Sequence, residues 1–162
     1  KGLELLINSI VEKQLKNSKI HLVIAGEFYE SKEKYLKLIT KNNLEKRISI
    51  YDEYIDNEMT KQLFCACDAV IQTYHSSTQS GVTPLAYFYN TPVLVSKIDG
   101  LKDPVLKDKS GVVSEKSTKE ISKNILKLLN NLDYYSNNIQ KAKSNYKWKD
   151  FTNELEKFIY NL

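Results

Sequence analysis

Between residues 68 and 100, an apolar run, a polar loop, a helical pattern and a second apolar run follow one another without interruption. The first run, residues 68–74, has the length and the apolar content of a buried strand. Helical spacing of apolar residues begins after Gly81 and ends at Asn90, and residues 92–96 form the second strand. Parallel strands need a crossover of about a dozen residues or more, which the helix and its loop supply. The segment therefore predicts a parallel strand–helix–strand unit.

The alternation of strands and helices continues along the whole chain. Apolar runs typical of strands lie at residues 20–26, 47–51 and 111–114. Helical periodicity marks residues 3–15, 32–42, 56–67, 117–129, 133–146 and 149–161, and residues 97–110 are expected to form a loop. Strands that alternate with helices imply a parallel sheet covered on both faces. The predicted fold class is α/β, with a doubly wound, Rossmann-like parallel sheet and helices on both faces.

The bulk composition is that of one globular domain. The chain has 162 residues, of which 41% are apolar and 27% charged, enough for a sizeable core. Its 24 basic residues are spread among 20 acidic ones, which leaves a net charge of +4. Dispersed charges of this kind are typical of a solvated surface, and we expect no nucleic-acid partner.

The cysteine pattern and the absence of ligand motifs argue against disulfides and metals. Cys65 and Cys67 are two residues apart in a predicted helix, and such residues do not share a helix face. This favours a reducing, intracellular compartment. The sequence has neither an Asp-x-Asp motif nor a cluster of His, Cys and Asp at ligand spacing, so we expect no metal. No apolar stretch approaches the ~20 residues of a membrane span, and no signal peptide is recognised.

The chain begins with Lys1 and Gly2 and runs directly into an apolar helix. A helix without a preceding strand is an unusual start for an α/β domain. We therefore expect residues 1–162 to be a single domain that lacks at least one strand upstream.

Ligands of open α/β sheets bind beyond the carboxyl ends of the strands. The loops predicted there are residues 27–31, 52–57, 75–80 and 97–103, and we expect them to meet in one cleft. Loop 75–80 precedes a helix N-terminus, where free N–H groups and the helix dipole attract anions, most often a diphosphate. The alternative is a strand–helix–strand unit with a polar loop and no ligand.

Several short motifs occur in a recognisable order. They are Lys1-Gly2-Leu3, Ala25-Gly26-Glu27, Tyr54-Ile55-Asp56-Asn57-Glu58, Cys67-Asp68-Ala69-Val70, Gln79-Ser80-Gly81-Val82, Thr91-Pro92-Val93, Asp99-Gly100-Leu101 and Tyr146-Lys147-Trp148. In this order, the chain resembles the C-terminal, nucleotide-sugar-binding domain of the group-1 retaining GT-B glycosyltransferases, in the branch that carries Q-S-G. The likeness spans nearly the whole chain.

The resemblance implies a role for each matching residue. Lys1 would bind the donor diphosphate and act in catalysis, although the Arg that accompanies it in the family falls upstream of this sequence. Backbone N–H groups of the loop would bind diphosphate and sugar, at Thr78, Gln79, Ser80, Gly81 and Val82. The turn at Tyr54 and Ile55 would hold the base, and Glu27, at the cleft edge, is a candidate for the base or the ribose. No cofactor is implied, because the nucleotide-diphosphate sugar is the donor substrate.

The chain departs from the family at two positions. Many members carry two Glu residues eight positions apart around the site helix, and these positions fall near Ser77 and Leu85 here. Gln79 is a candidate for part of the sugar contact, whereas Leu85 cannot hydrogen-bond a ribose. The absence of the pair leaves the donor open and slightly favours an inactive homologue. It does not prove inactivity, because the Q-S-G branch generally lacks the pair.

The expected function is donor binding by one half of a retaining glycosyltransferase of the hexosyltransferase type. The acceptor, a glycan or a lipid-linked molecule, would be held by a second domain that is absent here. Residues 1–162 alone are therefore expected to be inactive. Polysaccharide biosynthesis in the cytoplasm or at the inner face of the membrane would follow, with association of the full protein with a membrane surface.

Two other functions stay open. A non-catalytic relative could bind a sugar nucleotide as an interaction domain. A receiver-type signalling module also has a doubly wound sheet, but it needs an acidic pair after its first strand and a phosphorylatable Asp. Gly26 and Glu27 do not supply that pair, and Asp52 is a poor fit for the phosphorylated residue.

Overall fold

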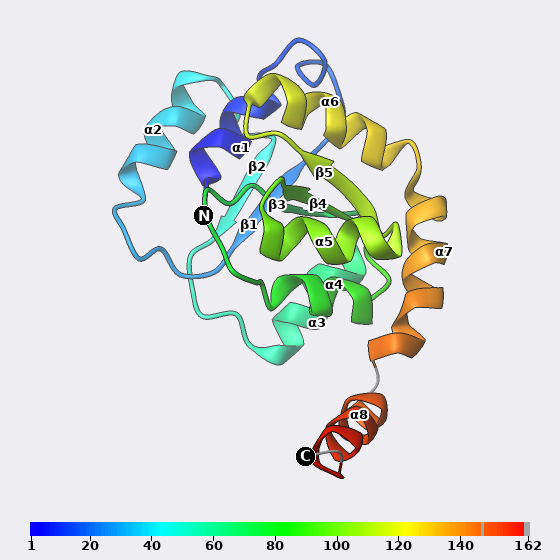
Figure 1. Cartoon of the computed structure of the whole chain (residues 1–162). Helices are drawn as coiled ribbons and strands as arrows, with labels where there is room; N and C mark the ends of the chain where they lie inside the picture. The colour runs from blue at the N-terminus through cyan, green and yellow to red at the C-terminus, as the bar shows by residue number, and fades with distance from the viewer. Residues whose placement is uncertain (147, 161–162) are drawn as a thin grey trace.

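A computed structural model describes residues 1–146 and 148–160 of the chain (Figure 1). The strands are β1 (Leu22–Ala25), β2 (Ile48–Tyr51), β3 (Val70–Gln72), β4 (Val93–Ser96) and β5 (Gly111–Ser114). The helices are α1 (Leu3–Ile10), α2 (Glu33–Lys41), α3 (Asn57–Ala66), α4 (Val82–Phe88), α5 (Asp99–Asp108), α6 (Thr118–Leu129), α7 (Leu132–Ala142) and α8 (Trp148–Tyr160), with a 3-10 turn, η1 (Lys143–Tyr146).

All paired strands are parallel, and they form two hydrogen-bonded sets. β1 pairs with β2, and β3, β4 and β5 pair in that order. Both sets lie on one core, because Ile48 of β2 and Leu94 of β4 belong to the same buried cluster. The predicted α/β class with parallel strands and helices on both faces is confirmed, although the strands are divided between two sheets.

Strand β4 separates the two helical layers. Its side chains alternate, as in any strand: Leu94 packs with α1, α2 and α6, whereas Val93 and Val95 pack with α4 and α5. All of its residues are buried. β4 therefore contributes buried side chains to both hydrophobic cores, and its carboxyl end is held from both faces.

Two predicted helix starts are confirmed by their caps. The carboxylate of Asp56 accepts a hydrogen bond from the N–H of Met59 at 2.8 Å. The hydroxyl of Ser117 accepts one from the N–H of Glu120 at 3.3 Å. Each bond satisfies an N–H group that a helix start leaves free.

The predicted helix at residues 3–15 is too long. α1 ends at Ile10, and turns follow it. Leu15 is fully buried all the same, which explains why the apolar spacing continues. Arg47 fixes these turns because its guanidinium donates to the carbonyl oxygens of Leu15 and Lys16, each at 3.0 Å.

The loop predicted at residues 97–110 is wrong, because ten residues of it form α5. Gly100 and Pro104 suggested a break in the chain. Leu101 and Val105 nevertheless lie one helical turn apart and are both buried, and this burial outweighs the poor helix propensity of the other two residues.

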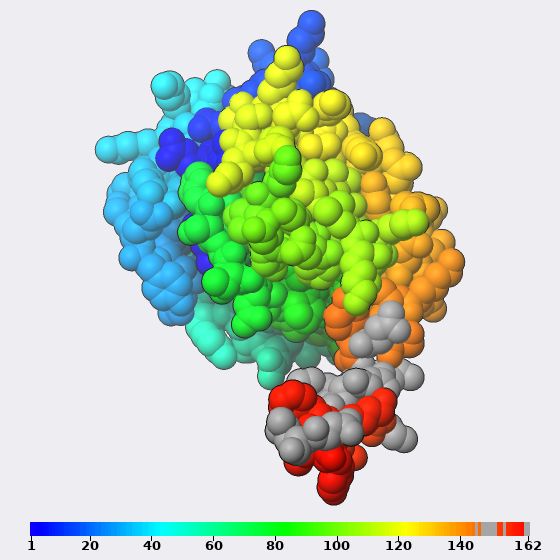
Figure 2. Space-filling model, viewed as in Figure 1, coloured from blue at the N-terminus to red at the C-terminus, as the bar shows by residue number. Residues whose placement is uncertain are grey.

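Of the two C-terminal helices, α7 lies against the body of the molecule and α8 lies away from it (Figure 1). α7 packs along it, and η1 turns the chain toward α8, which projects from the body (Figures 1 and 2). Three apolar side chains of α8, Leu155, Phe158 and Ile159, are exposed in the structure. Lys147 of the closing motif lies outside the described residues.

A buried tyrosine, Tyr87, joins α4 to α5 and to the 3-10 turn η1. The Tyr87 hydroxyl lies 2.6 Å from Ser110 Oγ and 3.1 Å from Asp108 Oδ2. Tyr146 donates to the same Asp108 oxygen at 2.5 Å and packs edge-on against the Tyr87 ring. Burial raises the pKa of Tyr87, so its phenol stays protonated well above neutral pH.

Removing the Tyr87 hydroxyl should destabilise the fold. Tyr87→Phe leaves the buried Ser110 hydroxyl without this partner, and we expect a loss of about 1–3 kcal/mol in the free energy of unfolding, measured by urea titration. Tyr134→Phe is the matched control, since Tyr134 is exposed, and it should change stability by less than about 0.5 kcal/mol. Equal effects of the two substitutions would contradict this role of Tyr87.

Candidate functional site at the carboxyl ends of the strands

The start of α1 lies directly against the carboxyl end of β3. The Thr73 hydroxyl donates to the carbonyl oxygen of Gly2 at 2.9 Å. A Cβ atom on Gly2 would lie 1.9 Å from the Thr73 carbonyl oxygen, and Gly2 has a φ of +76°. Both the contact and the left-handed backbone require glycine here. The Lys1-Gly2 pair is therefore fixed beside the end of the strand.

Lys1 is linked to loop 75–80 through one aromatic ring. Its ammonium nitrogen lies 4.2 Å from the centroid of the Tyr74 ring, a cation–π contact. The hydroxyl of the same tyrosine lies 3.4 Å from Ser80 Oγ. Tyr74 thus brings the predicted catalytic lysine and the predicted ligand loop together, although they are far apart in the sequence.

The loop itself presents unpaired backbone donors. Ser77 Oγ donates to the Gln79 carbonyl at 2.6 Å, and the N–H of Val82 donates to Ser80 Oγ at 3.3 Å. Among the described residues, the backbone N–H groups of residues 76–81 donate to no protein acceptor. Thr78 and Gln79 are also exposed. A row of free N–H groups on an exposed loop can bind an anion.

Gly81 is open in the structure. Its φ is −64°, which any residue can adopt, and a Cβ atom built on it would have no neighbour within 4 Å. Neither conformation nor packing inside the protein requires glycine. The absence of a side chain leaves the surface free at this point.

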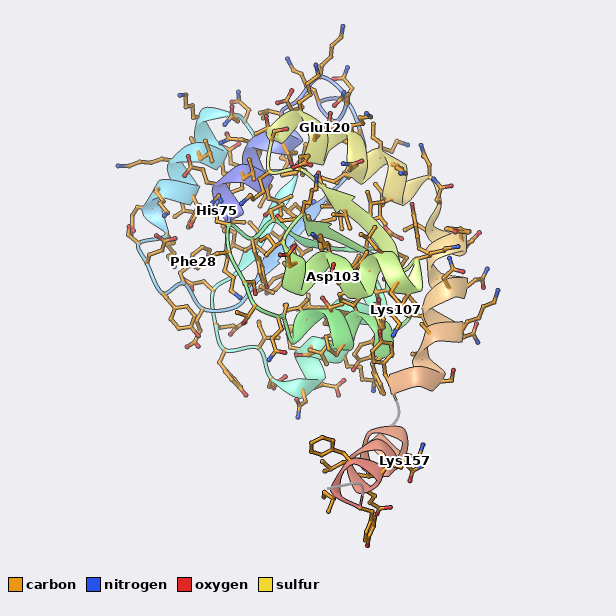
Figure 3. All side chains as sticks on the ribbon, viewed as in Figure 1. Phe28, His75, Asp103, Lys107, Glu120 and Lys157 are labelled. Atoms are coloured by element: carbon orange, nitrogen blue, oxygen red, sulfur yellow. The ribbon has the colours of Figure 1, made fainter. Side chains whose placement is uncertain are left out.

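The helix that follows is shorter than predicted. α4 spans seven residues and ends at Phe88, before the predicted end at Asn90, and Gly81 precedes it without a side-chain cap. Because so short a helix aligns few peptide dipoles, its dipole contributes less than the sequence suggested. Positive charge at the site comes instead from Lys1, and from Lys116, whose ammonium donates to the His75 carbonyl at 3.1 Å. In Figure 3, His75 lies beside the start of α1.

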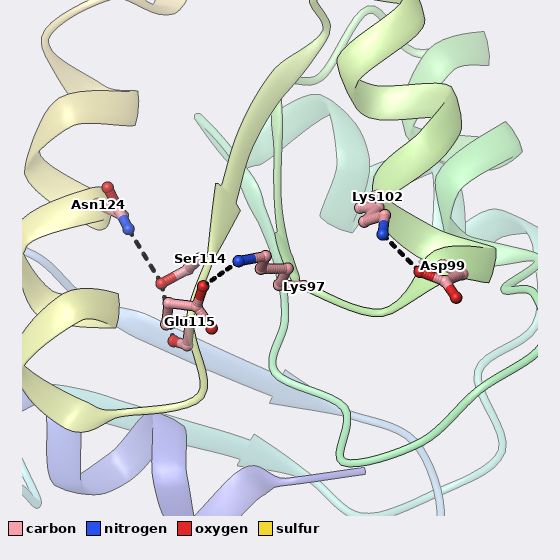
Figure 4. A network of polar contacts seen from close by, with 6 residues as sticks. All are labelled: Lys97, Asp99, Lys102, Ser114, Glu115 and Asn124. Carbon is pink, nitrogen blue, oxygen red and sulfur yellow. Dashed lines mark hydrogen bonds and ion pairs between the residues drawn. The ribbon is translucent and has the colours of Figure 1, made fainter.

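A polar network borders the loop on the side of α5 and β5 (Figure 4). Lys97 pairs with Glu115, and Lys102 pairs with Asp99, each at 2.5 Å. A hydrogen bond from Lys102 holds the pKa of Asp99 below its usual value. A cavity of about 510 Å³ is lined by Lys97, Lys102, Leu106, Val113, Glu115, Glu120 and Asn124.

The residues predicted to hold the base lie on two other loops. Tyr54 is 78% exposed, Ile55 is half-buried and Glu27 is exposed. Asp52 joins these loops because its carboxylate accepts from the N–H of Phe28 at 3.4 Å and pairs with Lys32 at 2.5 Å. The hydrogen bond from Lys32 lowers the pKa of Asp52.

The structure therefore brings together only part of the predicted set. Tyr74 joins Lys1 to Ser80 of the loop, whereas none of the described contacts joins Tyr54, Ile55 or Glu27 to that group. Tyr74 and Gly100 were not predicted as site residues. Tyr74 matters because it contacts Lys1, and Gly100 matters because it contacts Thr78. Both contacts join residues distant in the sequence, so only the fold reveals them.

The described residues contain no group of three or more His, Cys, Asp or Glu side chains placed to hold a metal ion. None of their helices is both long enough and apolar enough to cross a membrane.

The family model described as "Glycosyl transferases group 1" matches residues 1–131. The chain belongs to this family. No curated protein matches it. The family assignment excludes a receiver-type signalling module.

Solved structures show where the fold recurs. Sucrose-phosphate synthase from Thermosynechococcus elongatus has a TM-score of 0.81 at 17% identity, over 99% of this chain and 42% of the synthase. HepE of Anabaena, solved in complex with UDP, has a TM-score of 0.80 at 19% identity, over 100% of this chain and 46% of HepE. The C-terminal domain of LpcC, a group 1 family glycosyl transferase from Francisella tularensis, has a TM-score of 0.76 at 20% identity, over 91% and 80% of the two chains.

These similarities establish the fold. The chain spans less than half the length of the synthase and of HepE. It covers most of the LpcC structure, which is a C-terminal domain. The expected likeness to the C-terminal domain of a GT-B glycosyltransferase is confirmed.

Replacing Gly2 should disturb the placement of Lys1 and destabilise the chain. Gly2→Ala introduces a clash with Thr73 and a strained backbone, and we expect a loss of about 1–3 kcal/mol in the free energy of unfolding. Gly81→Ala is the control, because its site is open, and it should cost less than about 0.5 kcal/mol. Urea titration measures both. A Gly2→Ala protein as stable as Gly81→Ala would show that α1 does not depend on this contact.

Proposed function

We propose that this chain binds a nucleotide-diphosphate sugar through its diphosphate, as the donor half of a retaining glycosyltransferase. The observation that carries the proposal is the position of Lys1. Its ammonium lies on the ring of Tyr74, whose hydroxyl reaches Ser80 in the loop of free N–H groups. A cation beside a row of donors suits a diphosphate. HepE, of the same fold, has been solved with UDP and with UDP-glucose.

The chemistry assigned to these residues is charge stabilisation. When the bond from the sugar to the diphosphate breaks, negative charge grows on the departing nucleoside diphosphate. Lys1 and the free N–H groups of residues 78–81 are preorganised around that charge and would stabilise it most in the transition state. The chain needs no metal for this step if the lysine and the loop supply the charge.

The nucleoside is assigned to the neighbouring loops. Tyr54 offers an exposed aromatic ring, Ile55 an apolar contact and Glu27 a carboxylate that can accept from ribose hydroxyls. Asp52 bridges the two loops that carry them. These residues would orient the base and ribose while Lys1 holds the phosphates.

The acceptor is assigned to a second domain. We propose a glycan or a lipid-linked acceptor, a donor of the hexosyl type and a role in polysaccharide biosynthesis. The full protein would act in the cytoplasm or at the inner face of a membrane, with contact to the membrane surface. Because residues 1–162 would hold only the donor, they should not transfer sugar alone.

A non-catalytic sugar-nucleotide-binding relative is the second candidate. It is favoured by Ser77 and Leu85, which occupy the positions where many group 1 enzymes carry Glu. Leu85 is partly exposed and Ser77 bonds within its own loop. Turnover by the full-length protein separates the two candidates, since both bind the nucleotide.

Diphosphate recognition is tested by comparing UDP, GDP and ADP with their nucleosides in titration calorimetry. At least one diphosphate should bind ten-fold or more tightly than its nucleoside, because the nucleoside lacks the phosphates that Lys1 and the loop would bind. Gly81→Val should remove that preference while leaving the fold intact, since its side chain projects into open space. Thr40→Val, at an exposed position on α2, should change neither. Equal binding of all three pairs would refute the proposal.

Lys1 should contribute more to turnover than to donor binding. In the full-length enzyme, Lys1→Ala should lower kcat by roughly 10²-fold or more and raise the donor KM less, because charge develops in the transition state. Lys13→Ala, an exposed lysine beyond the far end of α1, serves as the control and should leave kcat within about two-fold. Near-normal turnover of the Lys1→Ala enzyme would contradict the catalytic role proposed for Lys1.

A further inference from the structure

The first turn of α5 packs against the backbone of the ligand loop. A Cβ atom on Gly100 would lie 1.6 Å from the carbonyl oxygen of Thr78, 2.3 Å from its carbonyl carbon and 3.0 Å from its Cα. Gly100 does not have a left-handed φ, so its backbone would accept any residue. Contact with Thr78 alone therefore requires glycine at this position.

This contact supports the loop at its middle. The Tyr74 hydroxyl lies 3.4 Å from Ser80 Oγ, which joins the two ends of the loop. The Lys116 ammonium donates to the carbonyl oxygen of His75. Between these points, the loop has no backbone ladder, because its N–H groups are free. The peptide of Thr78 is placed by its contact with Gly100.

A side chain at Gly100 would move the loop rather than the helix. α5 is anchored by Leu101 and Val105, which are 1% and 0% exposed. Thr78, in contrast, is exposed. An ordinary contact is 3.4 Å or more, so a methyl group 1.6 Å away requires a shift of about 1.8 Å. A misplacement of about 1 Å at a positioned group can cost roughly 10²-fold in function.

We infer that Gly100 is a positioning residue for diphosphate binding. Its bare backbone lets α5 hold the Thr78 peptide where the free N–H groups of residues 76–81 converge on the phosphates. This inference rests on the proposed function of that loop. It assigns to α5 a role that neither Lys1 nor the loop itself performs.

The test compares two glycines that both contact a backbone carbonyl. Gly111 is the matched control, because a Cβ atom built on it would lie 1.8 Å from the Val93 carbonyl oxygen. Both residues are at the amino ends of their strands, away from the ligand loop. Calorimetry should use the nucleoside diphosphate that the wild-type chain binds best among UDP, GDP and ADP, together with its nucleoside. Gly100→Ala should lose at least ten-fold in diphosphate affinity and keep its nucleoside affinity. Gly111→Ala should keep the ratio of the two affinities, even though it is less stable.

Three other results would count against these ideas in different ways. A Gly100→Ala protein with an unchanged affinity ratio would overturn the positioning role. So would a Gly100→Ala protein that circular dichroism shows to be unfolded, because the core and not the loop would then depend on the contact. A wild-type chain that does not prefer any diphosphate would overturn the proposed function itself, and the positioning role with it. In that case, unchanged amide NMR shifts of residues 76–80 in Gly100→Ala would further show that the loop had not moved.

Discussion

Close contact between bare backbones at two glycines determines the geometry of the candidate site. Gly2 lies against the Thr73 carbonyl, and Gly100 lies against the Thr78 carbonyl. The end of β3 and the loop that follows are therefore held between the start of α1 and the start of α5. A side chain at either glycine would separate these backbones, and this arrangement brings Lys1 to the loop.

Electrostatics at this edge of the molecule depends on side chains more than on helix dipoles. α4 is only seven residues long, so its partial charge is a small contribution. Lys97 and Lys102 are already paired with Glu115 and Asp99. Lys1, which packs on an aromatic ring instead of a carboxylate, keeps its charge available for a ligand. This difference explains why we assign the diphosphate to Lys1 and not to the more numerous lysines of the polar network.

The sequence predicted the fold well where side-chain periodicity dominates. β4 is buried on both faces, and its continuous apolar run made it recognisable. The prediction failed where long-range contacts override local signals. Gly100 and Pro104 favoured a loop where the structure has α5. Leu101 and Val105 of this helix are buried against β4 and β5, a contact that the local sequence does not show. The turns after α1 keep the apolar spacing because Leu15 is buried, and Arg47, distant in sequence, replaces the helical bonds by donating to their carbonyl groups.

The candidate site was predictable in its parts but not in its assembly. The order of the short motifs identified Lys1 and the Gln79-Ser80-Gly81 loop, and the family assignment is confirmed. Tyr74 could not be assigned from the sequence. Its ring contacts Lys1 and its hydroxyl contacts Ser80, and the local sequence does not show that these two residues lie close together.

A titration followed by amide NMR tests the location of the site most directly. On addition of the preferred nucleoside diphosphate to the wild-type chain, the largest shifts should fall on residues 76–82 and on Tyr74, with smaller ones at residues 52–55. Shifts confined to the cavity lined by Cys65, Asn90 and Asp133, at the opposite ends of the strands, would contradict the assignment of diphosphate binding to Lys1 and the loop.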